Sequence, residues 1–368
     1  MKILHLPAAA AILFAGFFTF SNLGAAENKS AGNMKFKRLF CWGYPGNEMQ
    51  AKKYADAGVT DIITATPKQY ALARKYGMTP YWKVFLPKGP YTQVMTPEEQ
   101  KYSDYINGAD LDKKISSADR MKILHRRRVE KQYRYGGDSI TEISAITTEI
   151  PCFSSDKDLT LSKKALDEQL QSAPEGVAGI FMDYFGYINN KGCYCQNCLR
   201  KYRKFLKKNK LADTPQNKAV FYRNEIVDYY NKVIDHVKSK RPAYKIVIHV
   251  YPLFKPDPLY GNRIRADYCG QTVAWYFKWD EKKIRAYTDF VLRHAKDYYK
   301  TAEGIPFLGI NHDKKSSLKY KTPEELESEL QTILRAGGRT LMVCTGSVII
   351  KDGYCEVFRK YCSKEPSK

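Results

Sequence analysis

From residue 37 onward, short apolar runs alternate with helix-like amphipathic segments. Most of the apolar runs are continuous and rich in β-branched or aromatic residues, which is typical of strands that are buried on both faces. The pattern predicts eight strands, at residues 38–44, 59–65, 79–85, 179–185, 245–251, 271–277, 306–311 and 339–344.

The helix-like segments carry recognisable start and stop signals. Asn47 is a candidate N-cap for a helix that ends before Gly58. Thr322 and Glu325 form a capping-box pattern, and Gly337 follows the end of that helix. Repeated strand–helix units imply parallel strands with helical crossovers, and at 368 residues the best fit is a closed (β/α)8 TIM barrel, fold class α/β. A doubly wound open sheet is the alternative, although no GxGxxG follows the first strand.

One interval, at about residues 88–160, is too long for a single crossover and predicts an insertion after the third strand. Active sites of such barrels are built from loops at the C-terminal ends of the strands. The insertion is therefore expected either to shape a substrate site or to serve as a stabilising surface element.

The first 26 residues have the layout of a secretory signal peptide. Lys2 precedes an apolar run over residues 7–20, and small residues lead to a cleavage site after Ala26. An uncleaved membrane anchor is the alternative, but the apolar run is short for one. We therefore expect a secreted or periplasmic protein whose residues 27–368 form a single barrel domain with no membrane span.

Composition excludes disorder, since 43% of the residues are hydrophobic and 27% are charged. Lys and Arg outnumber Asp and Glu by 61 to 39, giving a net charge of +22 that favours polyanionic partners. Sialylated, sulfated or uronate-bearing glycans are such polyanions outside a cell. The basic runs 125–128 and 200–210 carry no groove-reading motif, so no nucleic acid is expected, and the second run predicts an ordinary amphipathic helix with a solvated face.

A cysteine cluster follows the fourth predicted strand. Cys193, Cys195 and Cys198 make the sequence CYCQNC, and three thiolates at this spacing can surround one tetrahedral ion such as zinc. Cys152, in the loop that leads into the helix before the fourth strand, is the favoured fourth ligand of a structural Zn²⁺ site. A disulfide among these cysteines is the alternative in an oxidising compartment.

The run GIFMDYFGYINNKGCYCQNCLRKYRKFL, residues 179–206, resembles the fourth-strand segment of zinc-containing glycoside hydrolases of family 42, the β-galactosidase type. The CFSS sequence at 152–155 is similar to the C-x-x-S that completes the zinc site in that family. The resemblance implies a (β/α)8 barrel, a structural zinc ion and a carbohydrate substrate.

Two departures from the family pattern affect the expected chemistry. Where the family has an Asn-Glu pair on the fourth strand, this chain has Asp183 and Tyr184. The family's seventh-strand nucleophile is a Glu, whereas PFLGINHD offers only Asp313. Other sugar-hydrolysing barrels use an Asp at the end of the fourth strand as the nucleophile, and GIFMDYFGY is similar to that arrangement.

Glycoside hydrolysis usually requires two carboxylates, which in a barrel stand at the C-terminal ends of different strands. Asp183 is the first candidate, because a carboxylate at the end of an apolar strand is costly without a partner or a purpose. A salt bridge to a neighbouring strand is its alternative role. Asp280 and Asp313 are favoured as the second carboxylate over Glu149, although each could instead be a solvated or helix-capping group.

Aromatic side chains near strand ends can stack on sugars, although core packing is an equally ordinary role for them. The candidate platforms are Trp82, Tyr184, Trp275 and Tyr276. The candidate polar substrate contacts at a comparable depth are Lys83, His249, Lys278 and His312. No GxSxG or HExxH supports a peptidase or esterase. The sequence thus favours an exported glycoside hydrolase acting on an anionic glycan, with a non-catalytic glycan-binding barrel as the alternative.

Overall fold

The computed structural model describes residues 34–86, 116, 119, 151–185, 193, 195–250, 263–274, 279–297, 303–314 and 320–362. The signal peptide predicted at 1–26 and most of the insertion predicted at 88–160 lie outside these residues. No helix in the described part combines the length and the apolar character needed to cross a bilayer.

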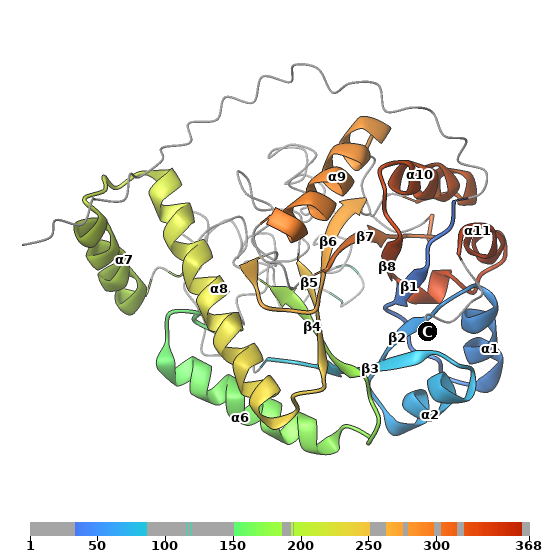
Figure 1. Ribbon diagram of the computed structural model, residues 1–368, viewed down its shortest axis with the longest axis horizontal. Coiled ribbons are helices and arrows are strands. Elements are labelled where there is room, and N and C mark those ends of the chain that lie inside the picture. Colours follow the sequence, from blue (N-terminus) through green and yellow to red (C-terminus); the bar gives the residue numbers. More distant parts are fainter. Residues whose placement is uncertain are drawn as a thin grey trace, which may run out of the picture. The chain divides into compact units, whose positions relative to one another are not determined.

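Eight parallel strands form a closed barrel in which each strand pairs with the next and β8 returns to β1 (Figure 1). The predicted (β/α)8 fold is confirmed. The strands are β1 (Arg38–Cys41), β2 (Asp61–Thr64), β3 (Thr79–Val84), β4 (Gly179–Phe185), β5 (Lys245–Val250), β6 (Tyr268–Ala274), β7 (Glu303–Gly309) and β8 (Thr340–Cys344).

Helices connect most of the successive strands and surround the barrel (Figure 1). The predicted caps are confirmed: Asn47 Oδ1 accepts from the backbone N–H of Gln50, and Thr322 and Glu325 form a reciprocal capping box. The helices are α1 (Glu48–Asp56), α2 (Pro67–Lys75), α6 (Asp156–Ser172), α7 (Gln196–Asn209), α8 (Pro215–Lys240), α9 (Glu281–Asp297), α10 (Pro323–Arg335), α11 (Tyr354–Tyr361) and the 3₁₀ turn η5 (Gly346–Val348).

Successive side chains along each strand point alternately into two parts of the hydrophobic core. One set faces the barrel axis and includes Phe40, Phe181 and Phe307. The other faces the helices; Leu39 packs there beside α1 and α10, and Ile180 beside α6 and α8. Because both faces of every strand are covered, the strands read as continuous apolar runs in the sequence.

The last strands begin earlier than the sequence pattern predicts. β6 starts at Tyr268 and β7 at Glu303, each three residues before the expected position. Tyr268 pairs with Glu303 in the ladder, and the Glu303 carboxylate accepts a hydrogen bond from Thr340 Oγ1 at 2.5 Å. Polar side chains fill this end of the barrel, so a hydrophobic pattern does not reveal where these strands start.

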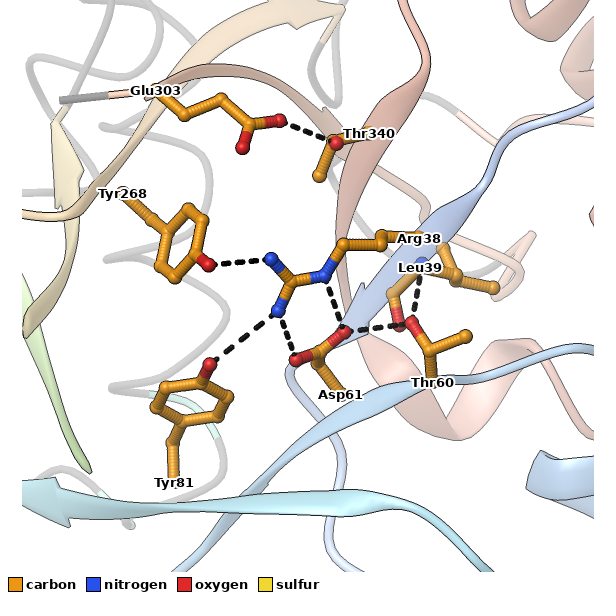
Figure 2. Close-up of polar contacts among 8 residues, drawn as sticks. All are labelled: Arg38, Leu39, Thr60, Asp61, Tyr81, Tyr268, Glu303 and Thr340. Carbon is orange, nitrogen blue, oxygen red and sulfur yellow. Dashed lines mark hydrogen bonds and ion pairs between the residues drawn. The ribbon is translucent and has the colours of Figure 1, made fainter. Parts of the chain in front are cut away.

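Arg38 is the centre of the polar network at the N-terminal end of the barrel (Figure 2). Its guanidinium donates to both carboxylate oxygens of Asp61 on β2, at 2.5 and 3.2 Å. It also reaches Tyr268 Oη on β6 at 2.6 Å. Burial alone would lower the pKa of Arg38, but the hydrogen bonds and the charge of Asp61 raise it above its ordinary value. Arg38 therefore carries a fixed positive charge that links three strands across the barrel.

The loops after β1 and β8 touch at the opposite end of the barrel. The backbone N–H of Gly346 donates to the carbonyl of Trp42 at 2.7 Å. A Cβ atom at Gly346 would lie 2.5 Å from both that carbonyl oxygen and Cys41 Sγ, so only glycine fits this contact. The close approach fixes the backbone of Trp42 at the C-terminal rim.

Removing the Asp61 carboxylate from the Arg38 network should destabilise the fold strongly. Asp61→Ala should lower the free energy of unfolding by about 3–5 kcal/mol, because it leaves a half-buried guanidinium unpaired. The measurement is denaturant unfolding followed by circular dichroism. The matched control is Asp56→Ala, which breaks an exposed ion pair with Lys52 and should cost less than about 1 kcal/mol. Equal losses in the two variants would contradict this role for Arg38.

Candidate functional site

The C-terminal rim of the barrel holds a lysine enclosed by aromatic rings. The Lys83 ammonium near the end of β3 lies 4.7 Å from the centroid of the Trp42 ring and 4.7 Å from that of Phe85, with Tyr44 at 5.8 Å. Among the described residues, no carboxylate pairs with it. Phe85 is 59% exposed and Tyr44 is 36% exposed, which is unusual for large apolar side chains. We call Trp42, Tyr44, Lys83 and Phe85 the rim cluster.

Helix α6 fixes one side of the rim cluster. The side-chain amide of Gln169 accepts from the backbone N–H of Phe85 at 2.7 Å and donates to its carbonyl at 2.8 Å. On the other side, Trp42 Nε1 donates to Tyr44 Oη at 3.1 Å. Both sides of the rim cluster are therefore held by hydrogen bonds as well as by packing.

His249 of β5 lies in the barrel beside the Trp42 ring. Its ring stacks on Phe307 with centroids 3.8 Å apart and lies 6.1 Å from Trp42. His249 Nε2 is 3.4 Å from Thr272 Oγ1. The side chain is fully buried, which places it below the exposed rings of the rim cluster.

Trp82 and Trp42 do not lie where the sequence analysis led us to expect. Trp82 was predicted as a sugar platform, but it packs with Val84 and Ile180 in the core between strands and helices. That prediction is wrong, because Lys83 and not Trp82 is on the axial face of β3. Trp42 was missed, although its two-residue spacing from the axial Phe40 is a signal that could have identified it.

Asp183 and Tyr184 lie in the last three residues of β4, at the strand end where the sequence analysis placed them. Their side chains are outside the part of the structure that can be described. The other predicted residues outside the described part are Glu149, Trp275, Tyr276 and Lys278.

Asp280 is a helix cap. Its Oδ1 accepts from the backbone N–H of Lys283 at 2.7 Å, and its carbonyl accepts from Ile284 at 3.0 Å, at the start of α9. The side chain is exposed. The structure thus gives Asp280 the helix-capping role that the sequence analysis named as its alternative.

Asp313 and His312 follow β7 on a braced turn. Asn311 accepts from the backbone N–H of Asp313 at 3.2 Å and donates to its carbonyl at 3.0 Å, while the Asp313 side chain is exposed. Burial and the positive charge of Lys351 lower the pKa of the half-buried His312, although Asp313 opposes that shift. The lowered pKa of His312 favours its neutral form, and Asp313 lies exposed beside it.

A buried lysine that the sequence analysis missed anchors this turn. Lys321 Nζ donates to the carbonyl of Gly309 at 2.8 Å and to Glu329 Oε2 at 2.6 Å. The backbone N–H of Lys321 donates to the carbonyl of Asn311 at 2.9 Å. The ion pair therefore ties the end of β7 to α10. A single buried charge gives no sequence pattern that would distinguish it from a surface lysine.

The four predicted cysteine ligands come together. Their Sγ atoms all lie within 4.8 Å of one another, with Cys152 3.3 Å from Cys198 and 4.0 Å from Cys195. A tetrahedral ion with metal–sulfur bonds of about 2.3 Å would hold four sulfurs about 3.8 Å apart, so this donor set fits one metal ion. The sulfur separation is too long for a disulfide, whose bond is about 2.05 Å.

The surroundings of the four sulfurs stabilise the thiolate of Cys152. Hydrogen bonds from Cys193 and Cys198 lower the pKa of Cys152 to about 3, and the backbone N–H of Ser154 adds to the effect. Hydrogen bonding to Cys152, together with burial, raises the pKa of Cys193 and of Cys198. Cys195 caps α7 and Cys198 lies in its first turn, where the helix dipole favours negative charge. The four residues could hold a metal ion that joins the segment before α6 to the start of α7.

The other five cysteines are also free thiols. Cys41 and Cys344 lie on the paired strands β1 and β8, but Cys41 packs toward the helices and Cys344 toward the barrel axis. Burial raises the pKa of Cys41 and of Cys269, so both stay protonated.

No family model and no curated protein sequence matches this chain. The fold is similar to the PgaB (BpsB) glycoside hydrolase domain from Bordetella bronchiseptica, with a TM-score of 0.57 and 9% identity over 90% of this chain and 100% of that domain. It is also similar to a polyextremophilic β-galactosidase from Halorubrum lacusprofundi, with a TM-score of 0.56 and 11% identity over 88% of this chain. This chain covers only 57% of that β-galactosidase. At these identities the likeness establishes the barrel fold.

The sulfur geometry predicts one bound metal ion per chain. Cys152→Ser should lose the ion and lower the melting temperature, because a hydroxyl is a poor replacement for a thiolate. Elemental analysis and thermal unfolding of the purified protein measure both effects. Cys355→Ser is the control, since Cys355 is buried in another cluster and its replacement should leave the metal content unchanged. Wild-type protein without metal, or full metal content in Cys152→Ser, would refute the site.

Proposed function

We propose that this protein is an exported, zinc-stabilised glycoside hydrolase that acts on an anionic glycan, with Asp183 as a catalytic carboxylate. The fold supports a carbohydrate substrate, because the PgaB domain and the β-galactosidase that share it are named as glycoside-cleaving proteins. The layout of residues 1–26 supports export.

The rim cluster is the observation that supports an anionic substrate. An ammonium that is surrounded by aromatic rings and has no described carboxylate partner is ready to pair with a carboxylate or sulfate on a sugar. The exposed rings of Tyr44 and Phe85 offer apolar faces on which a pyranose can stack. The net charge of +22 adds long-range attraction for a polyanion.

The proposed chemistry requires two carboxylates at the rim. Asp183 ends β4 and Asp313 follows β7, so they come from different strands of one barrel end. One carboxylic acid protonates the leaving glycosidic oxygen as the bond to the anomeric carbon breaks. The other either attacks the anomeric carbon or removes a proton from the attacking water. Since Asp280 caps α9, Asp313 is the partner we favour for Asp183.

Zinc is the metal we propose for the four cysteines. A set of four thiolates selects Zn²⁺ or an iron–sulfur centre, and a closed site of this kind leaves no coordination position for water. Zinc would hold the segment before α6 against the start of α7 and take no part in turnover. Cys152, Cys193, Cys195 and Cys198 would supply all of its ligands.

A non-catalytic barrel that binds glycans is the second candidate. The absence of a Glu from the PFLGINHD sequence at β7, and the use of Asp280 as a cap, both favour it. The two candidates differ in outcome, since a binding barrel retains an anionic glycan without releasing sugar from it.

Replacing Asp183 tests the hydrolase directly. Asp183→Asn should lower kcat by about 10²–10⁴-fold or more, because the amide can neither transfer the proton nor attack. Sugar release is measured on neutral, sialylated, sulfated and uronate-bearing glycans. Asp280→Asn is the matched control, and should keep its activity because Asn caps a helix as well as Asp. No release by wild-type protein with its metal bound would instead favour the binding barrel.

Replacing Lys83 tests the substrate class. Lys83→Gln should raise KM for an anionic oligosaccharide by roughly 10- to 100-fold, because a hydrogen bond to a charged group contributes about 1.5–3 kcal/mol. The increase for an uncharged glycan should be smaller. Lys68→Gln, on the exposed face of α2, is the control for the change of net charge. Equal effects on both substrates would contradict charge recognition by Lys83.

A further inference from the structure

Helix α7 has an unusual charge distribution. Its 14 residues include six lysines and arginines and no acidic residue. Most of these basic side chains are exposed along one face of the helix. They are Arg200, Arg203, Lys204, Lys207 and Lys208, which together we call the α7 basic face.

Acidic side chains do not neutralise the α7 basic face. Lys201, which lies beside it, pairs with Glu225 of α8 at 3.8 Å. The Arg200 guanidinium donates to the neutral amide of Asn197. Within the described part of the chain, no member of the α7 basic face has an ion-pair partner. Its charge is therefore open to solvent.

This arrangement opposes the stability of the helix itself. Arg200 and Lys204, Arg203 and Lys207, and Lys204 and Lys208 are like-charged pairs at i and i+4, which destabilise a helix. The helix dipole favours only the lysines of the last turn. These pairs break local rules of helix stability. Where a sequence breaks such rules and the structure gains nothing from it, the surface is expected to be functional or strained.

Other contacts hold α7 in place despite the repulsion. Cys198 joins the four-cysteine cluster, and Tyr202 is buried with its hydroxyl donating to Asp213 at 2.7 Å. Tyr202 and Phe205 both pack on Phe221 of α8. The α7 basic face is therefore a rigid surface that repeats its charges with each helical turn, about every 5.4 Å.

We infer that the α7 basic face binds an anionic polysaccharide chain that extends beyond the rim of the barrel. The cysteine cluster connects the start of α7 to the segments that follow β3 and β4, at the same end as Lys83. A long polyanion bound at the rim can therefore continue along α7. The identity of this partner as a glycan rests on the proposed function, whereas the unpaired cationic surface does not.

The side chains of α7 favour a polysaccharide over other polyanions. Helices that bind lipid surfaces place aromatic and aliphatic side chains into the bilayer, but Tyr202 and Phe205 are packed against α8. Sites for single-stranded nucleic acid add exposed aromatic platforms, and no aromatic side chain of α7 is exposed. Point charges that repeat along a rigid helix suit sulfates or carboxylates that repeat along a sugar chain.

The test compares two variants of equal charge. One changes Arg203, Lys204, Lys207 and Lys208 to Gln; the control changes Lys68, Arg74, Lys157 and Lys164, which are exposed on α2 and α6, to Gln. Binding to heparin and to polygalacturonate is measured between low and high salt, with neutral dextran as a blank. The α7 variant should bind at least about tenfold more weakly and lose salt dependence, whereas the control should stay close to wild type. Circular dichroism should show no loss of helix, since the change removes repulsion.

Several outcomes would overturn the inference. Equal weakening in both variants would mean that net charge alone attracts the polyanion. Unchanged binding by the α7 variant would place the contact elsewhere. Tighter α7-dependent binding to single-stranded DNA or to vesicles of anionic phospholipid would assign the surface to another class of partner. Sugar release is assayed separately on wild-type protein, so α7-dependent binding without hydrolysis would refute the proposed function and leave the docking surface intact.

Discussion

Closure of the strand ladder between β1 and β8 is the constraint on which the other features depend. Four residue pairs, from Arg38 with Thr340 to Cys41 with Val343, join the first and last strands in parallel. Because all eight strands run in one direction, their C-terminal ends meet at a single rim. The closed barrel brings Trp42 of the first loop beside both Lys83 of β3 and His249 of β5.

The cations at the two ends of the barrel, Arg38 and Lys83, have different surroundings. Arg38 at the N-terminal end donates to Asp61 and Tyr268, so its charge is neutralised and contributes to stability. Lys83 at the rim contacts the faces of aromatic rings, which attract a cation but satisfy none of its hydrogen-bond donors. The cation paired with a carboxylate and the cation in contact with aromatic rings therefore lie at opposite ends of the same barrel.

The cysteine cluster links the rim to the surface beyond it. Cys152 precedes α6, whose Gln169 fixes the backbone of Phe85 in the rim cluster. Cys198 lies in α7, whose exposed side carries the basic face. One metal ion bound by the four thiolates would hold both helices, so the rim and the α7 basic face would keep a fixed relation to each other. In the function we propose, such a metal would contribute to recognition and take no part in the chemistry.

The sequence alone determined the eight strands, the helix caps and the cluster of four cysteines, because burial, capping and cysteine spacing each impose a local pattern. It could not determine which face of a strand points inward, since strands covered on both sides are apolar throughout. For this reason Trp82 was expected at the rim and Trp42 was not. The role of Asp280 also required tertiary structure, because a carboxylate after a strand can be either a catalyst or a cap. Only the closed barrel decided these roles, by fixing where each strand ends and what surrounds it.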